Sequence, residues 1–197
     1  MSHVLDQTAL DQLFGEARTH MRWRPDPVPV DVLHRLHELL RWAPTSMNCQ
    51  PARFVFVTTD AARERLRPCL SPGNVEKTMS APVTAIIATD RRFHERMPQL
   101  WTASDAFGMF EGNEALREAT AQRNGTLQGA YLILAARALG LDCGPMSGFD
   151  TQAVDAAFLA DTPSWTTNFL CNLGYGDPAG LFPRGPRPAF DDVCRVV

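Results

Sequence analysis

The sequence predicts one domain of mixed helices and strands, in which helices cover both faces of a central sheet. Three observations predict it. The 197 residues, 45% hydrophobic and 21% charged, suffice for one globular core. Three β-type runs, residues 53–59, 82–89 and 168–176, lack the polar–apolar alternation of half-exposed strands, as strands covered on both faces do. Between the second and third runs lies a segment that is apolar on every side of a helix.

Two helices are expected before the first strand. The first would begin near Thr8, whose hydroxyl can cap the first turn together with Asp11. Its apolar face comprises Leu10, Leu13, Phe14 and Ala17. The second follows a Pro-rich link, has Asp31 as its N-cap and ends before Pro44. Its apolar stripe comprises Val32, Leu33, Leu36, Leu39 and Leu40.

The apolar segment 126–139 is expected to form the most buried helix, ended by Gly140. Leu127 and Tyr131 lie on one side of it, and Leu132 and Ile133 make the other sides apolar too. A chain this short most easily buries such a helix against a second copy of itself, so we expect a homodimer. Asp150 then caps a further helix. Its inward residues are Val154, Ala157 and Phe158.

Two segments stand apart from these elements. Residues 95–118 place Trp101, Phe107 and Phe110 among Gly, Ser, Asn and Pro, which is typical of a mobile cover over an active-site pocket. The alternative is a surface excursion whose aromatic rings dock on the core. The Pro- and Gly-rich residues 177–197 are too short to fold alone and are interpreted as a C-terminal extension of a single domain, residues 1–197.

Charge and cysteine content exclude several classes of protein. A net charge of -3 gives no global positive field, which argues against a nucleic-acid partner and favours a small-molecule one. The five cysteines form no C-x-x-C pair and are expected to be reduced thiols without zinc. The acidic N-terminus does not resemble a signal peptide, and no apolar run of about 18 residues exists, so we expect a cytoplasmic protein with no membrane partner.

Common catalytic motifs are missing from the sequence. It has neither a P-loop nor a G-x-S-x-G elbow, and the Gly-rich residues 174–180 run into Pro178 without a helix that could hold a pyrophosphate. His34 and His37 are one helical turn apart, but no matching carboxylates accompany them. They are predicted to face solvent, and no metal is expected.

Two kinds of polar residue remain as candidates for a binding site. Asn48 and Gln50 precede the first strand, where planar amides suit either recognition of a heterocycle edge or packing of the turn. Cations come from separate parts of the chain, and such groups suit either a phosphate or a solvated surface. They are Arg18, His20, Arg22, Arg24, Lys77, Arg184 and Arg187.

Five blocks around these residues resemble the nitroreductase family of FMN-dependent oxidoreductases. In order they are ARTHMRW, APTSMNCQPARFVF, GNVEKTMSAPVTAI, ALGLDCGPMSGFD and NLGYGD. The resemblance covers about residues 13–194 and is strongest to the branch that reduces malonic semialdehyde. It implies an α+β nitroreductase-like fold, with a central mixed or antiparallel sheet flanked by helices, as an intertwined homodimer with two FMN sites at the subunit interface.

The resemblance also implies which residues bind FMN. Arg18 and His20 match the first phosphate-binding block, and Arg184 or Arg187 matches the C-terminal phosphate cation. Asn74 and Lys77 match an Asn and a Lys that face the flavin ring. The turn before the first strand would reach the flavin or its ribityl chain, in part from the partner subunit, through Ser46, Asn48 and Gln50. The loop whose backbone N–H reaches flavin N5 matches Pro145, Met146, Ser147 and Gly148.

One departure bears on function. Many nitroreductases carry Glu where Ser147 stands, so contacts made by that Glu cannot be transferred to this chain. The resemblance implies a ping-pong cycle in which NADH or NADPH passes hydride to flavin N5 without a catalytic side chain and malonic semialdehyde then becomes 3-hydroxypropionate. A broad reductase of nitro compounds or quinones, and a flavin-binding protein without turnover, are the alternatives.

Overall fold

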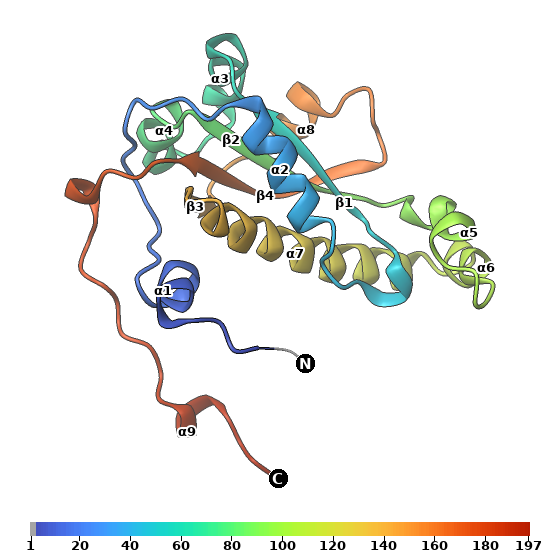
Figure 1. Cartoon of the computed structure of the whole chain (residues 1–197). Helices are drawn as coiled ribbons and strands as arrows, with labels where there is room; N and C mark the ends of the chain where they lie inside the picture. The colour runs from blue at the N-terminus through green and yellow to red at the C-terminus, as the bar shows by residue number, and fades with distance from the viewer. Residues whose placement is uncertain (1–2) are drawn as a thin grey trace.

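The computed structural model describes residues 3–197 and contains a four-stranded antiparallel sheet at its centre (Figure 1). The strands are β1 (Ala52–Val57), β2 (Val83–Asp90), β3 (Asp142–Met146) and β4 (Trp165–Gly174). Their order across the sheet is β1-β2-β4-β3, and every neighbouring pair is antiparallel. The prediction of three strands near residues 53–59, 82–89 and 168–176 agrees with β1, β2 and β4.

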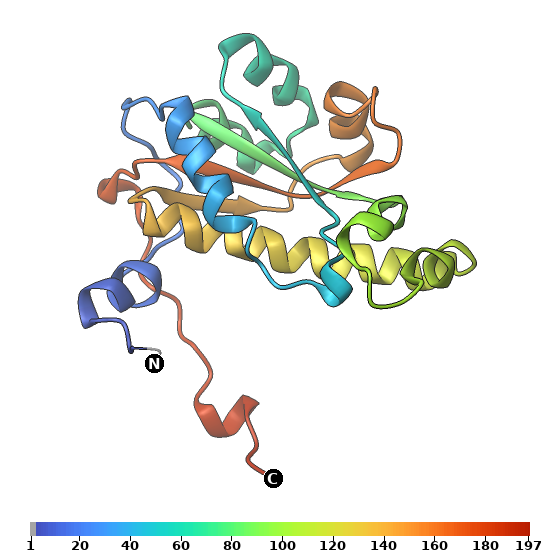
Figure 2. The same cartoon turned by 45° about the vertical axis from the view of Figure 1, so that its right-hand side comes forward.

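Helices lie on both faces of this sheet (Figures 1 and 2). The helices are α1 (Gln7–Leu10), α2 (Val30–Leu40), α3 (Asp60–Leu66), α4 (Pro72–Met79), α5 (Met97–Leu100), α6 (Ala106–Glu111), α7 (Glu114–Ala138), α8 (Thr151–Phe158) and α9 (Phe190–Val193). Tighter or wider turns occupy Asp11–Gly15, Ser46–Asn48, Arg67–Cys69, Phe93–Arg96 and Pro178–Gly180.

The central strand β2 shows why helices are needed on both faces. All eight of its residues are buried. Ile87 packs in a cluster with Leu36 of α2 and Leu132 of α7, whereas its neighbour Ile86 packs in a second cluster with Leu66 of α3 and Val154 of α8. Because successive side chains of a strand point to opposite faces, both faces of β2 must be covered by apolar helix surface.

Two glycines allow α7 to lie close to the sheet. A Cβ at Gly125 would stand 2.2 Å from the Cγ2 atom of Thr89, and a Cβ at Gly129 would stand 2.6 Å from the ring of Phe169. No side chain larger than hydrogen fits at either place without movement of its neighbour. The glycines therefore set how near α7 approaches β2 and β4.

The fourth strand, β3, has no counterpart among the predicted strands. It contains Gly144 and Pro145, residue types that argue against a strand interior. Pro145 is tolerated because β4 is the only strand of residues 3–197 that pairs with β3, and the isolated bridge on the other side of β3 joins Thr19 to Cys143 and does not involve Pro145.

Helix beginnings differ from the prediction at two places. Asp6, not Thr8, caps α1 by accepting a hydrogen bond from the backbone N–H of Ala9. Helix α2 begins at Val30 after Pro29, so Asp31 lies in the first turn instead of at the N-cap. Pro29 occupies the N-cap position with its φ angle fixed at -62° and makes no side-chain capping bond, so α2 begins without a side-chain cap. The cap of α8 is as predicted, since Asp150 accepts from the N–H of Ala153 at 3.0 Å.

Helix α7 is 25 residues long and begins 12 residues before the predicted start, with Asn113 as its N-cap. It is not buried on all sides in one chain. Leu127 is 45% exposed and Tyr131 is 37% exposed, whereas Leu132 and Ala136 on the sheet side are fully buried. The helix therefore presents an apolar stripe to the outside of the chain.

The segment 95–118 is folded into short helices instead of an open loop. Phe110 of α6 is buried with Phe93 and Met97 in a small cluster of their own, and Trp101 packs against that cluster. Phe107 stays exposed but stacks on the ring of His94. The docking of these aromatic rings agrees with the alternative interpretation, and a role as an active-site cover stays a prediction.

The C-terminal residues 182–197 are exposed throughout and run away from the sheet (Figure 1). All five cysteines are free thiols, of which Cys194 in this tail is exposed and the other four are buried. Among residues 3–197, no helix combines the length and apolar composition that crossing a bilayer requires.

Candidate active site

The turn before β1 has an unusual backbone. Met47, Asn48 and Gln50 all have positive φ angles, of 51°, 52° and 42°. A left-handed conformation costs a residue with a Cβ about 1–2 kcal/mol, although Asn tolerates it better than most. Such outliers persist only where surrounding contacts hold them, and they gather at functional sites.

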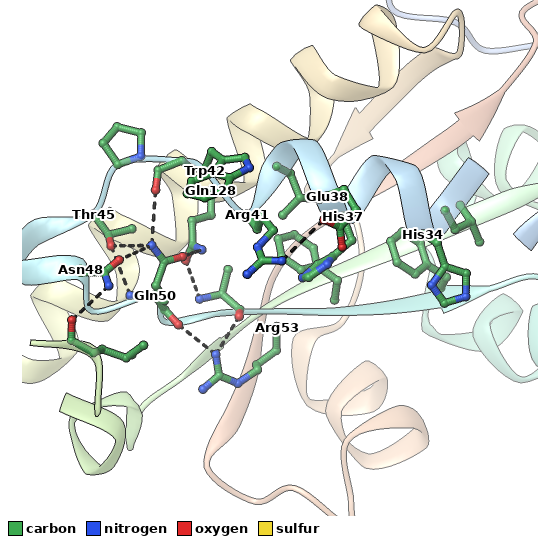
Figure 3. Close-up of a pocket in the computed structure, with 18 of the residues that line it drawn as sticks. His34, His37, Glu38, Arg41, Trp42, Thr45, Asn48, Gln50, Arg53 and Gln128 are labelled. Carbon is green, nitrogen blue, oxygen red and sulfur yellow. Dashed lines mark hydrogen bonds and ion pairs between the residues drawn. The ribbon is translucent and has the colours of Figure 1, made fainter. Parts of the chain in front are cut away.

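Amide side chains hold this turn (Figure 3). The Nε2 group of Gln50 donates to Asn48 Oδ1 at 2.9 Å and to Thr45 Oγ1 at 3.2 Å. The Nδ2 group of Asn48 donates to the carbonyl of Leu100 at 3.1 Å, which joins the turn to the segment 95–118. Asn48 and Gln50 are therefore parts of one hydrogen-bonded group, as turn packing predicts, while the side chain of Asn48 remains exposed.

A cavity of about 1060 Å³ lies beside these amides, between α2 and β1 (Figure 3). Asn48 and Gln50 line one part of it, and the exposed His34 and His37 line another, so the two histidines face solvent as predicted. Arg53 also borders the cavity, but its guanidinium is bound to the buried carboxylate of Asp90 at 2.7 Å.

The predicted phosphate cations come from both ends of the chain, and the structure brings some of them together. The guanidinium of Arg18 donates to the carbonyl of Phe182, and the guanidinium of Arg184 donates to the carbonyl of Ala17 at 3.4 Å. Arg187 bonds only to carbonyls of its own segment. Arg184, and not Arg187, therefore lies beside the N-terminal basic block.

Lys77 lines a smaller cavity of about 320 Å³ with Arg22 and residues 179–182. Partial burial lowers the pKa of the Lys77 amine. Among residues 3–197 no carboxylate forms an ion pair with Lys77 or Arg22. Glu76 lines the cavity as well but makes no ion pair with either cation. A half-buried cation with no carboxylate bound to it is stabilised by an anion from outside, so this cavity suits a negatively charged ligand.

His20 is buried, unlike the neighbouring cations Arg22 and Arg24 of the N-terminal basic block. Its side chain is only 8% exposed, its Nε2 atom lies 3.3 Å from Asp142 Oδ1, and its ring covers Gly176 so closely that a Cβ there would collide. Its backbone N–H bonds to the carbonyl of Cys143 on β3. In this chain His20 is an anchor that fixes the basic block to the sheet edge, and its contact with phosphate stays a prediction.

Asn74 and the loop after β3 are in direct contact. The Nδ2 group of Asn74 donates to the carbonyl of Gly148 at 2.7 Å, and a Cβ at Gly148 would stand 2.4 Å from that nitrogen. Met146 is buried against Thr78, whereas Ser147 is exposed. Because Asn74 and Lys77 share α4, the predicted loop Pro145–Gly148 and the predicted cation lie on the same side of the protein.

Residues 45–50 form the turn before β1 and are called the amide turn below. Two residues of α7 that sequence reasoning missed hold this turn. Asn124 Oδ1 accepts from the N–H of Ser46 at 2.8 Å, and Gln128 accepts from the N–H of Ala52 at 2.8 Å. Both side chains are almost fully buried. The signal that could have identified them is the pattern N-G-x-x-Q-G at residues 124–129, at the start of the helix expected to be buried. An amide side chain that is buried needs a hydrogen-bond partner, so each of these two residues had to contact another part of the chain.

Comparison with known proteins decides the family. A model described as the nitroreductase family matches residues 16–175. The chain belongs to this family. A Burkholderia lata protein provisionally named NADH dehydrogenase/NAD(P)H nitroreductase is 60% identical over 193 residues, which cover 98% of each chain. The predicted family and the predicted enzyme class, an oxidoreductase, are confirmed.

Solved structures of nitroreductases confirm the predicted fold. A Bacillus subtilis nitroreductase superposes with a TM-score of 0.86 at 20% identity, over 98% of this chain and 100% of that one. A nitroreductase from Exiguobacterium sibiricum, solved in complex with FMN, gives a TM-score of 0.83 at 16% identity, over 100% of this chain and 99% of that one.

FMN is bound in the Exiguobacterium structure, and the residues of this chain fit such a group in two parts. The amide turn offers planar donors and acceptors beside a large cavity, and the region around α4 offers Lys77 and Arg22, neither of which is in an ion pair within residues 3–197, beside a small one. In the fold, however, the amide turn and α4 lie at opposite ends of α7 (Figure 1). One chain does not bring the two parts together.

Proposed function

We propose that the protein is an FMN-dependent oxidoreductase that takes hydride from NADH or NADPH and passes it to a small-molecule acceptor. The observation that carries this proposal is the match to the nitroreductase family over residues 16–175. That range contains all the predicted contacts except Arg184 and Arg187. The name of the 60% identical relative supports the reductant, and the FMN complex of the Exiguobacterium protein supports the cofactor.

The chain's own residues divide the work of binding. Arg18 and Arg184, which the two ends of the chain bring side by side, hold the phosphate. Lys77 supplies a positive charge near the ring, where it stabilises negative charge. Asn74 fixes the loop Pro145–Gly148 through the carbonyl of Gly148, so that backbone N–H groups of that loop can face the ring.

The side-chain amides of Asn48 and Gln50 bind the edge of the ring and the ribityl chain, and their hydrogen bonds allow the cofactor only one orientation. When bound, FMN supplies the redox chemistry, because it can accept hydride at N5 from one substrate and give it to another. No side chain is required as a nucleophile or general base. The residues position the ring and leave one of its faces open, so that each substrate can bind there in turn. They also place positive charge beside the negative charge of the cofactor.

A homodimer is part of the proposal. The amide turn and the cation region lie at opposite ends of α7, so a complete site requires the amide turn of one chain and the cations of a second one. The exposed stripe with Leu127 and Tyr131 on α7 supports such an association, because exposed apolar surface on a helix is stabilised by a partner. The proposal also includes a cytoplasmic location, because nicotinamide reductants are available there and thiols remain reduced.

For the acceptor, we propose malonic semialdehyde, which the enzyme would reduce to 3-hydroxypropionate. This choice rests on the sequence blocks that resemble the semialdehyde-reducing branch and on Ser147, which stands where many nitroreductases carry Glu. A broad reductase of nitro compounds or quinones is the second candidate, and the names of the relatives favour it.

One purified sample tests both levels of this proposal. The protein is expected to be yellow, to release FMN on heating, to lose its visible absorbance when NADH or NADPH is added without oxygen, and to regain it when acceptor follows. Comparison of kcat/KM for malonic semialdehyde and for a nitroaromatic then ranks the acceptors. Colourless protein that takes up no FMN contradicts the cofactor, and flavin that NADH and NADPH cannot reduce indicates a binding protein without turnover. A semialdehyde that is no better than the nitroaromatic contradicts the specific acceptor.

Replacing Arg18 with alanine tests the phosphate site. Loss of one charge-assisted contact is expected to raise the Kd for FMN about 10- to 100-fold, corresponding to about 1.5–3 kcal/mol. Fluorescence titration of the apoprotein measures it, and circular dichroism checks the fold. The matched control is Arg67→Ala, since Arg67 forms only a surface ion pair with Glu64 on α3. Equal affinities in the two variants would remove Arg18 from the site.

A further inference from the structure

The amide turn cannot keep its shape through its own contacts alone. Its bonds between Gln50, Asn48 and Thr45 are local, and they would move with the turn if it relaxed. Three of its residues have positive φ angles, a conformation that surrounding structure must enforce. One outside contact is the bond from Asn48 to the carbonyl of Leu100, and two more come from α7, which glycines bring close to the sheet.

Two buried amides of α7 brace the turn at its two ends. Asn124 accepts from the N–H of Ser46, where the turn begins, and Gln128 accepts from the N–H of Ala52, where β1 begins. Asn124 also donates to the carbonyl of Thr120 in its own helix at 2.8 Å. Because the two residues are four positions apart, they lie on one face of the helix and act on the turn together.

Gln128 does more than brace, because it sets the direction of a chain of amides (Figure 3). The N–H of Ala52 can only donate, so Gln128 must present its oxygen there and its Nε2 group to Gln50 Oε1, at 2.6 Å. Gln50 must then present Nε2 to Asn48 Oδ1. Asn48 must in turn present Nδ2 to the carbonyl of Leu100, which can only accept.

From this geometry we infer that Gln128, assisted by Asn124, is a positioning residue that decides which polarity Asn48 and Gln50 present to a bound ligand. The inference rests on the proposed function, in which those two amides contact FMN. Gln128 itself is buried behind Gln50 and acts through it. Hydrogen-bonded amides polarise one another, so the orientation fixed at Ala52 is carried to the exposed end at Asn48.

The test is Gln128→Glu, which keeps the length of the side chain and its acceptor for Ala52 but removes the N–H that Gln50 accepts. If Gln50 turns its amide over to donate, its oxygen points at Asn48 Oδ1 and at the carbonyl of Ala43. Asn48 then either turns and loses its bond to the carbonyl of Leu100, or stays and faces that oxygen with its own, so the amides are perturbed in both cases. Gln128→Met is the second variant, because it removes both hydrogen bonds without adding a charge. The matched control is Gln122→Glu, the same change at an exposed position of α7.

Two measurements on FMN-loaded protein report the polarity of the amides. Gln128→Glu is expected to raise the Kd for FMN about tenfold, corresponding to about 1.4 kcal/mol, and to shift the midpoint potential of the bound flavin away from that of wild type and Gln122→Glu. A purely structural role would lower stability without moving the potential at saturating FMN. Wild-type affinity and potential in both Gln128 variants would overturn the inference.

Hydrogen exchange in the apoprotein tests the bracing without FMN. Gln128→Met is expected to accelerate exchange at the N–H of Ala52 about tenfold with little change at Ser46, and Asn124→Leu is expected to do the opposite. Unchanged exchange at both amides would show that α7 does not hold the turn. If wild-type protein binds no FMN, the proposed function fails and the inferred role in polarity fails with it. If wild-type protein binds FMN but the Gln128 variants have unchanged affinity and midpoint potential, only the inference is overturned.

Discussion

Two chains that are each inactive are expected to recover activity when they form a mixed dimer. One chain carries Asn48→Ala and Gln50→Ala, and the other carries Arg18→Ala and Lys77→Met. If each site takes its amides from one subunit and its cations from the other, a mixed dimer has one intact site and one site with both defects. Random pairing makes half of the dimers mixed, so about 25% of wild-type sites return before the mixed dimer is isolated and about 50% in the isolated mixed dimer.

Co-expression with two affinity tags isolates the mixed dimer, in which FMN content and reductase activity are then measured. The matched control combines a chain carrying only Arg18→Ala with a chain carrying only Lys77→Met. Both changes affect the cation half, so every site in that mixed dimer keeps one defect and no recovery is expected. Recovery in neither pair would show that each site is built from one chain. Recovery in the control would show that Arg18 and Lys77 of one site come from different chains, which also contradicts the proposed arrangement.

The second large effect concerns stability and the contact between α7 and the sheet. Gly125→Ala is expected to destabilise the protein by about 1–3 kcal/mol, because its Cβ would overlap the Cγ2 atom of Thr89, a buried and stiff β-branched side chain. The expected value is the net change in the free energy of unfolding. It already includes the gain of about 1 kcal/mol that alanine brings over glycine in a helix interior. Thermal unfolding of the apoprotein measures it, at about 2–4 °C per kcal/mol.

Two further variants make that result specific. Gly73→Ala on α4 is the matched control, since a Cβ there meets nothing within 4 Å and the substitution should be neutral or stabilising. Thr89→Ser removes the Cγ2 atom, so it should restore much of the stability lost in Gly125→Ala. A Gly125→Ala protein as stable as Gly73→Ala would mean that α7 does not approach β2 this closely.

Much of the fold was predictable because its signals are local. The β-type runs of β1, β2 and β4 and the cap at Asp150 depend on residues adjacent in sequence. The edge strand β3 was not predictable in this way, because Pro145 is acceptable only at an edge, which is a property of the completed sheet. The first half of α7 was missed because residues 114–125 are mostly polar and show no apolar stripe.

For the candidate site, the sequence predicts residue types but not their arrangement. It predicts Asn48 and Gln50 as amides addressed to a ligand, which stays a prediction, whereas their dependence on Gln128 requires knowledge that α7 passes beneath the turn. Arg184 and Arg187 could not be distinguished by spacing alone, and the fold separates them by placing Arg184 against Ala17. Long-range contacts of this kind follow from packing, which no local pattern encodes.

The distribution of thiols has a practical consequence. Cys194 is the exposed cysteine among residues 3–197, while burial raises the pKa of Cys49 to about 11 and raises that of Cys69 as well. A maleimide fluorophore should therefore attach at one defined point near the end of the tail. In the proposed dimer, energy transfer between two dyes attached there would follow the tails of both copies during assembly and flavin uptake, without engineering a new labelling position.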